Sequence, residues 1–367
     1  MAKFKVIISG GGTGGHIFPA IAIANAIKKK RPDTEFLFVG AKGKMEMIKV
    51  PEAGFEIIGL PIMGLQRSFT VKNLKFPFKL LKSLRKARRI VKDFKPDLAI
   101  GVGGYASGPL LRAAKKAKVP TMIQEQNSYA GLTNKLLGKK ADKICVAYNG
   151  MDQFFPKDKI VLTGNPVRSE VIKLEGKKAR AEEHFKLQKD KKTVLVVGGS
   201  LGAWSVNEAV ESAIESWSNE DIQVIWQTGK LFHKNAVKAA EGHESWLKVT
   251  EFINRMDLAY AAADLIVSRA GAIAVSEICL VKKPVIFVPL PSAAEDHQTK
   301  NANVLATLGA AALVKDSQVR DELGKLVINL INNEDELQSL SENIAPMGYH
   351  DAAELIADEA LKLIDSR

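Results

Sequence analysis

Three glycine-rich stretches are the first places in this sequence where chemistry could occur. They are Gly10–Gly15, Gly103–Gly108 and Gly198–Gly202, and each follows a short run of aliphatic residues. A glycine turn between a strand and a helix lets backbone N–H groups approach a phosphate, and the helix N-terminus adds a favourable dipole. Because tight strand–helix turns also use glycine for packing, one such stretch is weak evidence. Three of them in one chain favour an anionic ligand.

The glycine pattern departs from two common classes of nucleotide-binding protein. The first stretch fits GxGxxG only with Gly10, Gly12 and Gly15 as its glycines, and Phe38–Gly40 stands where the ribose-binding acid should end the second strand. The string GxxxxGK[ST] of the P-loop does not occur in the chain. The sequence therefore disfavours hydride transfer from a dinucleotide and ATP hydrolysis.

Polar side chains accompany the glycine turns. His16 directly follows the first stretch, and since its imidazole titrates near neutrality it is a candidate general base or phosphate partner; a helix cap is the alternative. Glu277 belongs to the helix expected after Ser268–Gly271, where a carboxylate could bind a ribose diol or merely complement the helix dipole. The polar run Glu295–Gln298 opens another helix at the sheet edge where such folds bind ligands.

The spacing of ligand-type residues predicts no metal centre. Cys145 and Cys279 form no CxxC pair, and the histidines and acids form no cluster with metal-ligand spacing. Both cysteines lie in apolar runs, which is typical of buried structural thiols, and a chain with so few cysteines is expected in a reducing cytoplasm.

Two similar halves supply the elements that must position these residues. Lys5–Ser9 and Thr193–Val197 are continuous apolar runs, typical of parallel strands buried on both faces, and each leads into a glycine turn and a helix. Helical segments separate the strands, so the predicted fold class is α/β, with two Rossmann-like doubly wound parallel-sheet domains. Further strands are expected at Glu35–Val39, Leu98–Val102, Thr121–Gln124, Ile144–Val146, Ile222–Trp226, Leu265–Val267 and Pro284–Val288.

The length of the chain agrees with two domains. Its 367 residues, 46% hydrophobic and 26% charged, have globular composition and exceed one ordinary core. The turn-forming Thr163–Val167 predicts a hinge, with domains 1–163 and 164–350, and the last helix, from about Asp351 to Ile364, could pack on either. We expect no signal peptide and no membrane-spanning segment, since no apolar run reaches about 18 residues.

A basic stretch between Arg67 and Lys95 holds eleven lysines or arginines and one acid, Asp93, in a chain of net charge +12. Such a cluster seeks phosphates on nucleic acid or on anionic lipid. Nucleic acid is disfavoured, because no RRM, KH or helix-turn-helix pattern is visible and aromatic residues are only 7%. Apolar residues among the cations suit shallow insertion into an anionic leaflet; a solvated helix with its leucines facing the core is the alternative.

Seven strings of the chain resemble, in order, the MurG family of bacterial glycosyltransferases. The resemblance implies a GT-B fold, with an N-terminal acceptor domain, a C-terminal donor domain and an active-site cleft between them, and it places the C-terminal helix, about 351–367, on the N-terminal domain. The family transfers GlcNAc from UDP-GlcNAc, with inversion, to the MurNAc 4-hydroxyl of undecaprenyl-diphospho-MurNAc-pentapeptide (lipid I), giving lipid II in peptidoglycan synthesis. The strings are Gly11–Pro19, Gly103–Tyr105, Glu125–Asn127, Gly164–Arg168, Gly198–Ala203, Glu251–Ile253 and Ser268–Gly271 with Glu277.

The resemblance also implies roles for single residues. His16 becomes the candidate base for the acceptor hydroxyl, with Glu125 or a water as alternatives, and neither metal nor cofactor is expected, because helix dipoles would offset charge on the departing UDP. The residues implied in UDP-GlcNAc binding are Thr13, Gly14, Gly15, Asn127, Arg168, Ser200, Ile253, Ala272, Ile273, Glu277 and Gln298. Those implied at the acceptor diphosphate are Gly12, Gly103, Gly104 and Tyr105, and those at the membrane are Leu74, Phe76, Phe78, Lys79 and Lys82.

A lipid-linked acceptor implies peripheral attachment to the cytoplasmic face of the cell membrane, with an anionic membrane surface and proteins of wall synthesis and division as partners. Another UDP-sugar enzyme of the same fold, such as a lipid glycosyltransferase or a UDP-GlcNAc 2-epimerase, is the closest alternative. The membrane-seeking stretch speaks against the epimerase, which needs no second substrate. A nucleotide- or nucleic-acid-binding protein without catalysis and an NAD-dependent dehydrogenase are the more distant alternatives.

Overall fold

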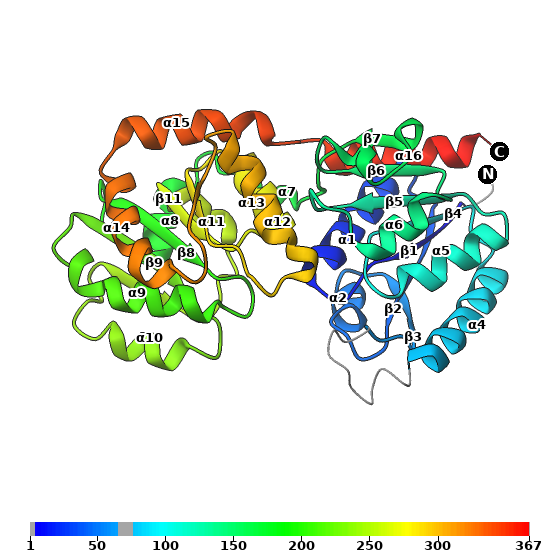
Figure 1. The fold of residues 1–367 in the computed structure, drawn as a ribbon, viewed down its shortest axis with the longest axis horizontal. Coiled ribbons are helices and arrows are strands. Elements are labelled where there is room, and N and C mark those ends of the chain that lie inside the picture. The colour runs from blue at the N-terminus through cyan, green and yellow to red at the C-terminus, as the bar shows by residue number, and fades with distance from the viewer. Residues whose placement is uncertain (1–3, 65–75, 367) are drawn as a thin grey trace. The chain divides into compact units, whose positions relative to one another are not determined.

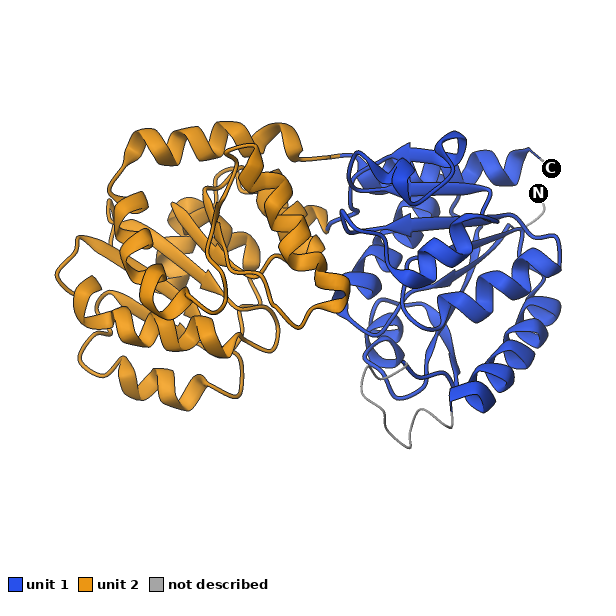
Figure 2. Ribbon diagram, in the orientation of Figure 1, with its two compact units in different colours: residues 1–167, 351–367 blue, residues 168–350 orange. Residues whose placement is uncertain are grey.

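The computed structural model describes residues 4–64 and 76–366, which form two compact units (Figures 1 and 2). Unit 1 comprises residues 1–167 and 351–367, and unit 2 comprises residues 168–350. The division falls at Val167/Arg168 and not at the expected 163/164, because Asn165 is bound to the first unit. Its amide accepts a hydrogen bond of 2.9 Å from the Gln124 side chain and donates one of 2.9 Å to the Gln126 carbonyl.

Unit 1 contains a seven-stranded, fully parallel sheet in the order β3-β2-β1-β4-β5-β6-β7. The strand order reverses at β1, so Gly10–Gly15 leaves the sheet at its topological switch point, where α/β folds bind their ligands. The strands are β1 Lys5–Ser9, β2 Glu35–Ala41, β3 Glu56–Leu60, β4 Leu98–Gly101, β5 Thr121–Glu125, β6 Lys143–Val146 and β7 Ile160–Leu162.

Helices cover both faces of this sheet. The core formed by Val6 and Ile8 of β1 also contains residues of α1 and α16, whereas Ile7 of the same strand packs in the core with residues of α4 and α5. Burial on both faces explains the unbroken apolar runs of the strands. The helices are α1 Gly14–Lys30, α2 Glu46–Glu52, α4 Phe76–Phe94, α5 Ser107–Lys116, α6 Leu132–Gly138 and α16 Ala352–Asp365, with short 3-10 turns at Met151–Gln153 and Lys157–Lys159.

The C-terminal helix α16 is an integral part of unit 1. Its buried Ile356, Ala357 and Ala360 share a core with the apolar face of α1. Ion pairs border this contact, at 2.9 Å for Lys29 and Glu354 and at 2.6 Å for Lys30 and Asp358.

Unit 2 repeats the architecture with a six-stranded parallel sheet in the order β10-β9-β8-β11-β12-β13. The order reverses at β8, which places Gly198–Gly202 where unit 1 has its first glycine stretch. The predicted class of two doubly wound parallel-sheet units is confirmed. The strands are β8 Lys192–Val197, β9 Ile222–Gln227, β10 Leu247–Thr250, β11 Leu265–Ser268, β12 Val285–Phe287 and β13 Ala312–Leu313.

The helices of unit 2 also form two layers. Val194 and Val196 of β8 pack with residues of α9, α10 and α14, while Leu195 packs with residues of α8, α11, α12 and α13. The helices are α7 Ser169–Ile172, α8 Lys178–Phe185, α9 Trp204–Trp217, α10 His233–Ala239, α11 Met256–Ala262, α12 Ala272–Val281, α13 His297–Thr307, α14 Val319–Ile331 and α15 Glu334–Ile344, with 3-10 turns at Ala294–Asp296 and Ala345–Met347.

Both cysteines are buried and free, and burial raises the pKa of Cys145 and of Cys279 to about 12. The thiols are therefore protonated and inert at neutral pH, as expected of structural cysteines. Across the described part of the chain, none of the helices is long and apolar enough to cross a bilayer.

Candidate functional site

A buried carboxylate that was not predicted from the sequence is hydrogen-bonded to the first glycine stretch. Glu46, the first residue of α2, is fully buried, and its Oε2 accepts a hydrogen bond of 2.9 Å from the N–H of Gly12. Its Oε1 accepts another, of 2.9 Å, from the N–H of Ala41 at the end of β2. The Gly12 N–H is thus engaged within the protein, and its predicted contact with an acceptor diphosphate stays a prediction.

His16 lies in the first turn of α1, beside the second glycine stretch. Its main-chain N–H donates to the Thr13 carbonyl at 3.1 Å, and its Nδ1 lies 3.4 Å from the Thr13 hydroxyl. The ring packs on Gly103, whose φ is +100° and where a Cβ would lie 2.6 Å from the imidazole Nε2. Gly104 contacts the Gly11 carbonyl so closely that a Cβ there would collide with it. The structure therefore brings the predicted base together with both glycine stretches of unit 1.

Tyr105 and the start of α5 complete this side of unit 1. The Tyr105 side chain is half exposed and packs against Gly64, where a Cβ would collide with its ring. Ser107, the first residue of α5, is buried, and its hydroxyl oxygen lies 2.9 Å from the Ser9 carbonyl and 2.8 Å from the Gly103 carbonyl, which share its single proton. This hydroxyl ties the second glycine stretch to the end of β1.

Glu125 ends β5 and is almost fully buried, with 1% of its surface exposed. Its carboxylate accepts hydrogen bonds from the main chain and side chain of Asn127, from the Gly131 N–H at 3.0 Å and from the Asn134 amide at 2.9 Å. Burial raises the pKa of Glu125, and these hydrogen bonds, that from Asn134 foremost, oppose the rise. A carboxylate so fully satisfied orders the loop that carries Asn127, which suits a positioning role better than that of a base.

The second unit presents its glycine stretch differently. Gly199, Ser200 and Leu201 are exposed at the carboxyl end of β8. Gly202 and Gly229 adopt φ of +79° and +72° and pack back to back, so that a Cβ on either would collide with the neighbouring main chain. The loop carrying Ser200 is therefore fixed by main-chain packing while its tip remains accessible.

A buried glutamine, also missed by the sequence analysis, joins two parts of the predicted donor site. Gln227 ends β9 and is 2% exposed. Its amide nitrogen donates to the Gly199 carbonyl at 2.8 Å, and its amide oxygen accepts from the Ile253 N–H at 3.2 Å. The Ile253 N–H is thus engaged within the protein, and the predicted contact of the Ile253 backbone with a uracil stays a prediction. The only signal in the sequence was a polar residue ending an otherwise apolar strand.

Glu277 lies in α12 and is buried, with 8% of its surface exposed. The Tyr260 hydroxyl donates to its Oε2 at 3.1 Å, and Arg168 Nη2 lies 3.9 Å from its Oε1. Burial raises the pKa of Glu277, and the charge of Arg168 opposes the rise. Ala272 and Ile273 form the first turn of the same helix, whose end receives no side-chain cap, so their N–H groups are available to an anion.

Arg269 and Gln298 shape the neighbouring loops. Arg269 is buried and donates to the two main-chain carbonyls that follow β12, to Asp316 at 2.5 Å and to the Ser205 hydroxyl at 3.0 Å. Gln298 accepts a hydrogen bond of 2.9 Å from the Leu290 N–H through its side-chain oxygen. In the part of the chain that the structure describes, the Gln298 amide nitrogen has no hydrogen bond, so it remains a donor for a ligand.

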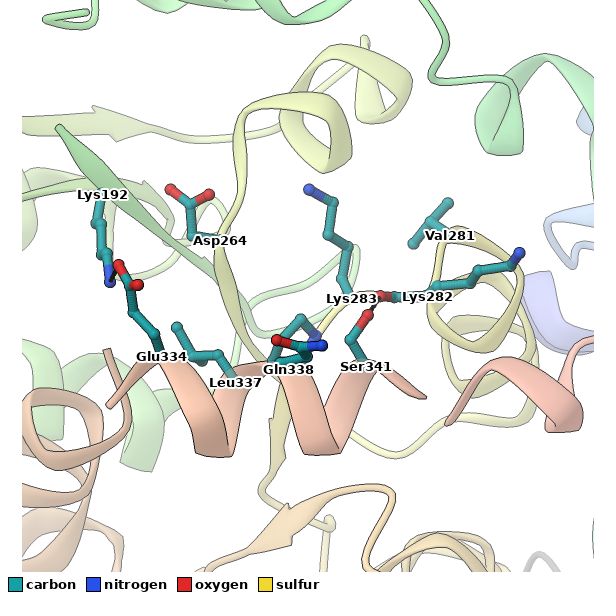
Figure 3. Close-up of a pocket in the computed structure, with 10 residues that line it drawn as sticks. Lys192, Asp264, Val281, Lys282, Lys283, Glu334, Leu337, Gln338 and Ser341 are labelled. Atoms are coloured by element: carbon teal, nitrogen blue, oxygen red, sulfur yellow. Dashed lines mark hydrogen bonds and ion pairs between the residues drawn. The ribbon is translucent and has the colours of Figure 1, made fainter. Parts of the chain in front are cut away.

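A pocket at the other end of the strands of the second sheet is not part of this site. It lies at the amino ends of β8, β11 and β12, against α15 (Figure 3). Lys192 and Glu334 form an ion pair of 3.0 Å at its side, and Lys283 and Asp264 also line it. The predicted donor residues follow the carboxyl ends of the strands, and none of them lines this pocket. Within the described residues, moreover, no group of three His, Cys, Asp or Glu side chains could hold a metal ion.

Helix α4 lies entirely within the basic stretch, and Leu74 lies outside the described residues. Phe78 and Leu81, 76% and 52% exposed, accompany exposed Lys82 near the start of the helix, while Phe76 and Lys79 are partly buried. The side of the helix that faces the core is formed instead by Ser83, Ala87, Ile90 and Val91.

Comparison with known proteins first defines the class. Residues 6–146 match the glycosyltransferase family 28 N-terminal domain, and residues 193–356 match its C-terminal domain. A crystal structure of MurG from Acinetobacter baumannii superposes with a TM-score of 0.79 at 28% identity, covering 98% of this chain and all of that one. A UDP-GlcNAc 2-epimerase from Neisseria meningitidis shares the fold alone, with a TM-score of 0.66 at 16% identity.

Full-length relatives narrow the class further. A protein of Parabacteroides distasonis is 52% identical over the whole of both chains, and one of Bacteroides thetaiotaomicron is 54% identical over 99% of each. Both are named UDP-N-acetylglucosamine--N-acetylmuramyl-(pentapeptide) pyrophosphoryl-undecaprenol N-acetylglucosamine transferase. The chain belongs to glycosyltransferase family 28 and, within it, to the MurG family of these enzymes.

Proposed function

We propose that this chain transfers GlcNAc from UDP-GlcNAc to the MurNAc 4-hydroxyl of undecaprenyl-diphospho-MurNAc-pentapeptide, giving lipid II and UDP. The single observation that carries the proposal is identity above 50% over the full length of relatives named for this transfer. The epimerase alternative rests on 16% identity, which supports a shared fold and no shared reaction.

Unit 2 would bind the donor. Glu277, held by Tyr260, would accept hydrogen bonds from the ribose diol, since a buried carboxylate offers two acceptor oxygens. The exposed Ser200 tip and the uncapped start of α12 would bind the diphosphate. The same groups would stabilise the charge that develops on UDP as it leaves, without requiring a metal.

Unit 1 would supply the base. In an inverting transfer the acceptor oxygen forms a bond to the anomeric carbon while the bond from that carbon to UDP breaks, and a base removes the hydroxyl proton. His16 suits this step, because histidine is a common general base and because this ring is set between two glycine stretches. Glu125 would instead hold the loop of Asn127 in place.

We further propose that α4 brings unit 1 to the anionic surface in which the acceptor is embedded. The exposed Phe78 and Leu81 would insert among lipid headgroups, and the cations around them would add about 1 kcal/mol each. The protein would then act as a peripheral protein on the cytoplasmic face of the membrane. Contacts with wall-synthesis and division proteins remain an expectation of the family resemblance.

The transfer is tested by incubating the protein with UDP-GlcNAc and a lipid I analogue and measuring UDP. We expect UDP release that depends on the acceptor, together with a product heavier by one GlcNAc. Release without acceptor, or conversion of UDP-GlcNAc to its 2-epimer, would refute the proposal. Sedimentation with anionic vesicles tests the membrane step separately.

A further inference from the structure

Glu46 is a buried carboxylate that is hydrogen-bonded to the loop preceding the predicted base, His16. It is inaccessible to solvent, and it links two main-chain segments by accepting from Gly12 and Ala41, each at 2.9 Å. Hydrogen bonds to an ionised acceptor are about twice as strong as neutral ones. The carboxylate therefore fixes the Gly12 amide to the end of the neighbouring strand β2.

Two glycines make room for this side chain. A Cβ on Gly11 would collide with the Glu46 carboxylate, and one on Gly40 would lie 2.5 Å from its Cγ. Both glycines have φ outside the left-handed region, so backbone conformation does not require glycine there. Their absence of a side chain is explained by the close approach of Glu46.

The contacts continue from this carboxylate to His16. Gly12 adopts a φ of +89° and leads into Thr13, whose carbonyl accepts the N–H of His16 at 3.1 Å. On the other side, the Gly11 carbonyl lies against Gly104, next to the glycine on which the imidazole packs. A shift of Gly11–Thr13 would therefore move both supports of the imidazole.

We propose that Glu46 is a positioning residue of the transfer reaction: it holds Gly11–Thr13, and through them His16, in the conformation that the acceptor hydroxyl requires. The inference rests on the proposed function. Glu46 does not contact substrate, and its effect is expected in turnover, because misplacing a reacting group by about 1 Å costs on the order of 100-fold in rate.

The test compares Glu46→Gln and Glu46→Ala with Glu52→Gln. Glu52 is a matched control, since it lies on the same helix but is exposed and forms an ion pair with Lys49 on the surface. We expect kcat to fall about 100-fold in the alanine variant and about tenfold in the glutamine variant, which keeps one acceptor oxygen. The KM for UDP-GlcNAc and the Kd for UDP should stay within twofold, and Glu52→Gln should resemble wild type.

Hydrogen exchange read by mass spectrometry separates positioning from folding. Peptides covering residues 10–18 should exchange faster in both Glu46 variants, while peptides from β4 and β5 exchange as in wild type. The proposal is overturned if Glu46→Ala keeps kcat within threefold, or if β4 and β5 also lose protection in both variants. Failure of the wild-type enzyme to release UDP would instead refute the proposed function, and the exchange data would still show whether Glu46 holds the loop.

Discussion

The two glycine stretches that follow β1 and β8 occupy the same place in their sheets and differ in what they hold. Each leaves the strand at which the order reverses and leads into a helix. The first gives the N–H of Gly12 to the protein's own Glu46. The second exposes Gly199 and Ser200, and among the residues that the structure describes no carboxylate is hydrogen-bonded to its N–H groups.

This difference separates two uses of one local sequence pattern. A glycine turn at a switch point can bind a ligand's anion, as the second stretch is proposed to do, or an internal anion that fixes its shape. The carboxylate of Glu46 would also repel a phosphate brought close behind Gly12. We therefore expect the first stretch to position a catalytic group and the second to bind UDP, so that substitutions in the two units should affect different kinetic constants.

The largest effect is expected for His16→Ala. If the imidazole removes the acceptor proton, kcat should fall by a factor of about 10² to 10⁴, while the Kd for UDP stays near that of wild type. Steady-state kinetics and UDP calorimetry measure the two quantities. A loss of UDP affinity that matches the loss of kcat would contradict the proposed division of roles between the two glycine stretches. Unchanged turnover would remove His16 as the base.

Glu277→Gln should give the opposite pattern in unit 2. The neutral amide loses a charged acceptor for the ribose diol, so UDP affinity should fall roughly 10- to 100-fold. Since burial raises the pKa of Glu277, wild-type UDP affinity should begin to fall on acidification at a higher pH than the ordinary titration of glutamate, and this dependence should disappear in the variant.

Stability provides the control for this substitution. Because the folded-state pKa of Glu277 is raised, folding disfavours the charged form. The free energy of unfolding therefore falls as the pH rises from the ordinary glutamate pKa to the raised pKa of the folded state. The glutamine variant removes that cost, so its Tm at neutral pH should not decrease. Weaker UDP binding together with a lower Tm would indicate that the carboxylate is structural.

The interior of each sheet could be predicted from the sequence, and its edges could not. The nine predicted strands are all interior strands, while the four that were not predicted, β3, β7, β10 and β13, are the edges of the two sheets. An interior parallel strand is buried on both faces and reads as a continuous apolar run. Edge strands are only partly buried, as all three residues of β7 are, so they need no such run.

The site shows a similar limit. Glycine turns and motif strings identified residues in the turns and helix starts that follow strands, such as Ser200 and His16. Glu46, Gln227 and Tyr260 were missed because each acts on a residue 17 to 34 positions away in the chain. Contacts of that kind are set by the packing of strands and helices, and spacing in one sequence does not reveal them.

Gln227→Ala tests whether the glycine stretch of unit 2 depends on the two hydrogen bonds that the Gln227 side chain makes. The substitution removes the hydrogen bonds to Gly199 and Ile253, so the two segments proposed to bind the diphosphate and the uracil should become less ordered relative to each other. We expect UDP affinity to fall roughly tenfold, a cost of about 1.4 kcal/mol, with kcat at saturating donor changed less than threefold. Calorimetry and kinetics check both values. A fall in kcat as large as that for Glu46→Ala would contradict the division of roles between the two loops.

The smallest effect is expected from Asp257, the second residue of α11, which follows the loop of Ile253. Its carboxylate lies 2.7 Å from Lys177 and accepts two hydrogen bonds from Arg255, and the Arg255 guanidinium, followed by Lys177, holds the pKa of Asp257 well below its usual range. Because that pKa is lowered, the stabilisation is present above about pH 4 and is lost as the pH falls further. Asp257→Asn should therefore lower the free energy of unfolding at pH 7 by about 1–2 kcal/mol, since Arg255 is partly solvent-screened, and should weaken its dependence on pH below 4. Calorimetric unfolding from pH 3 to 7 measures this; equal acid sensitivity of the variant and wild type would show that the carboxylate contributes nothing to unit 2.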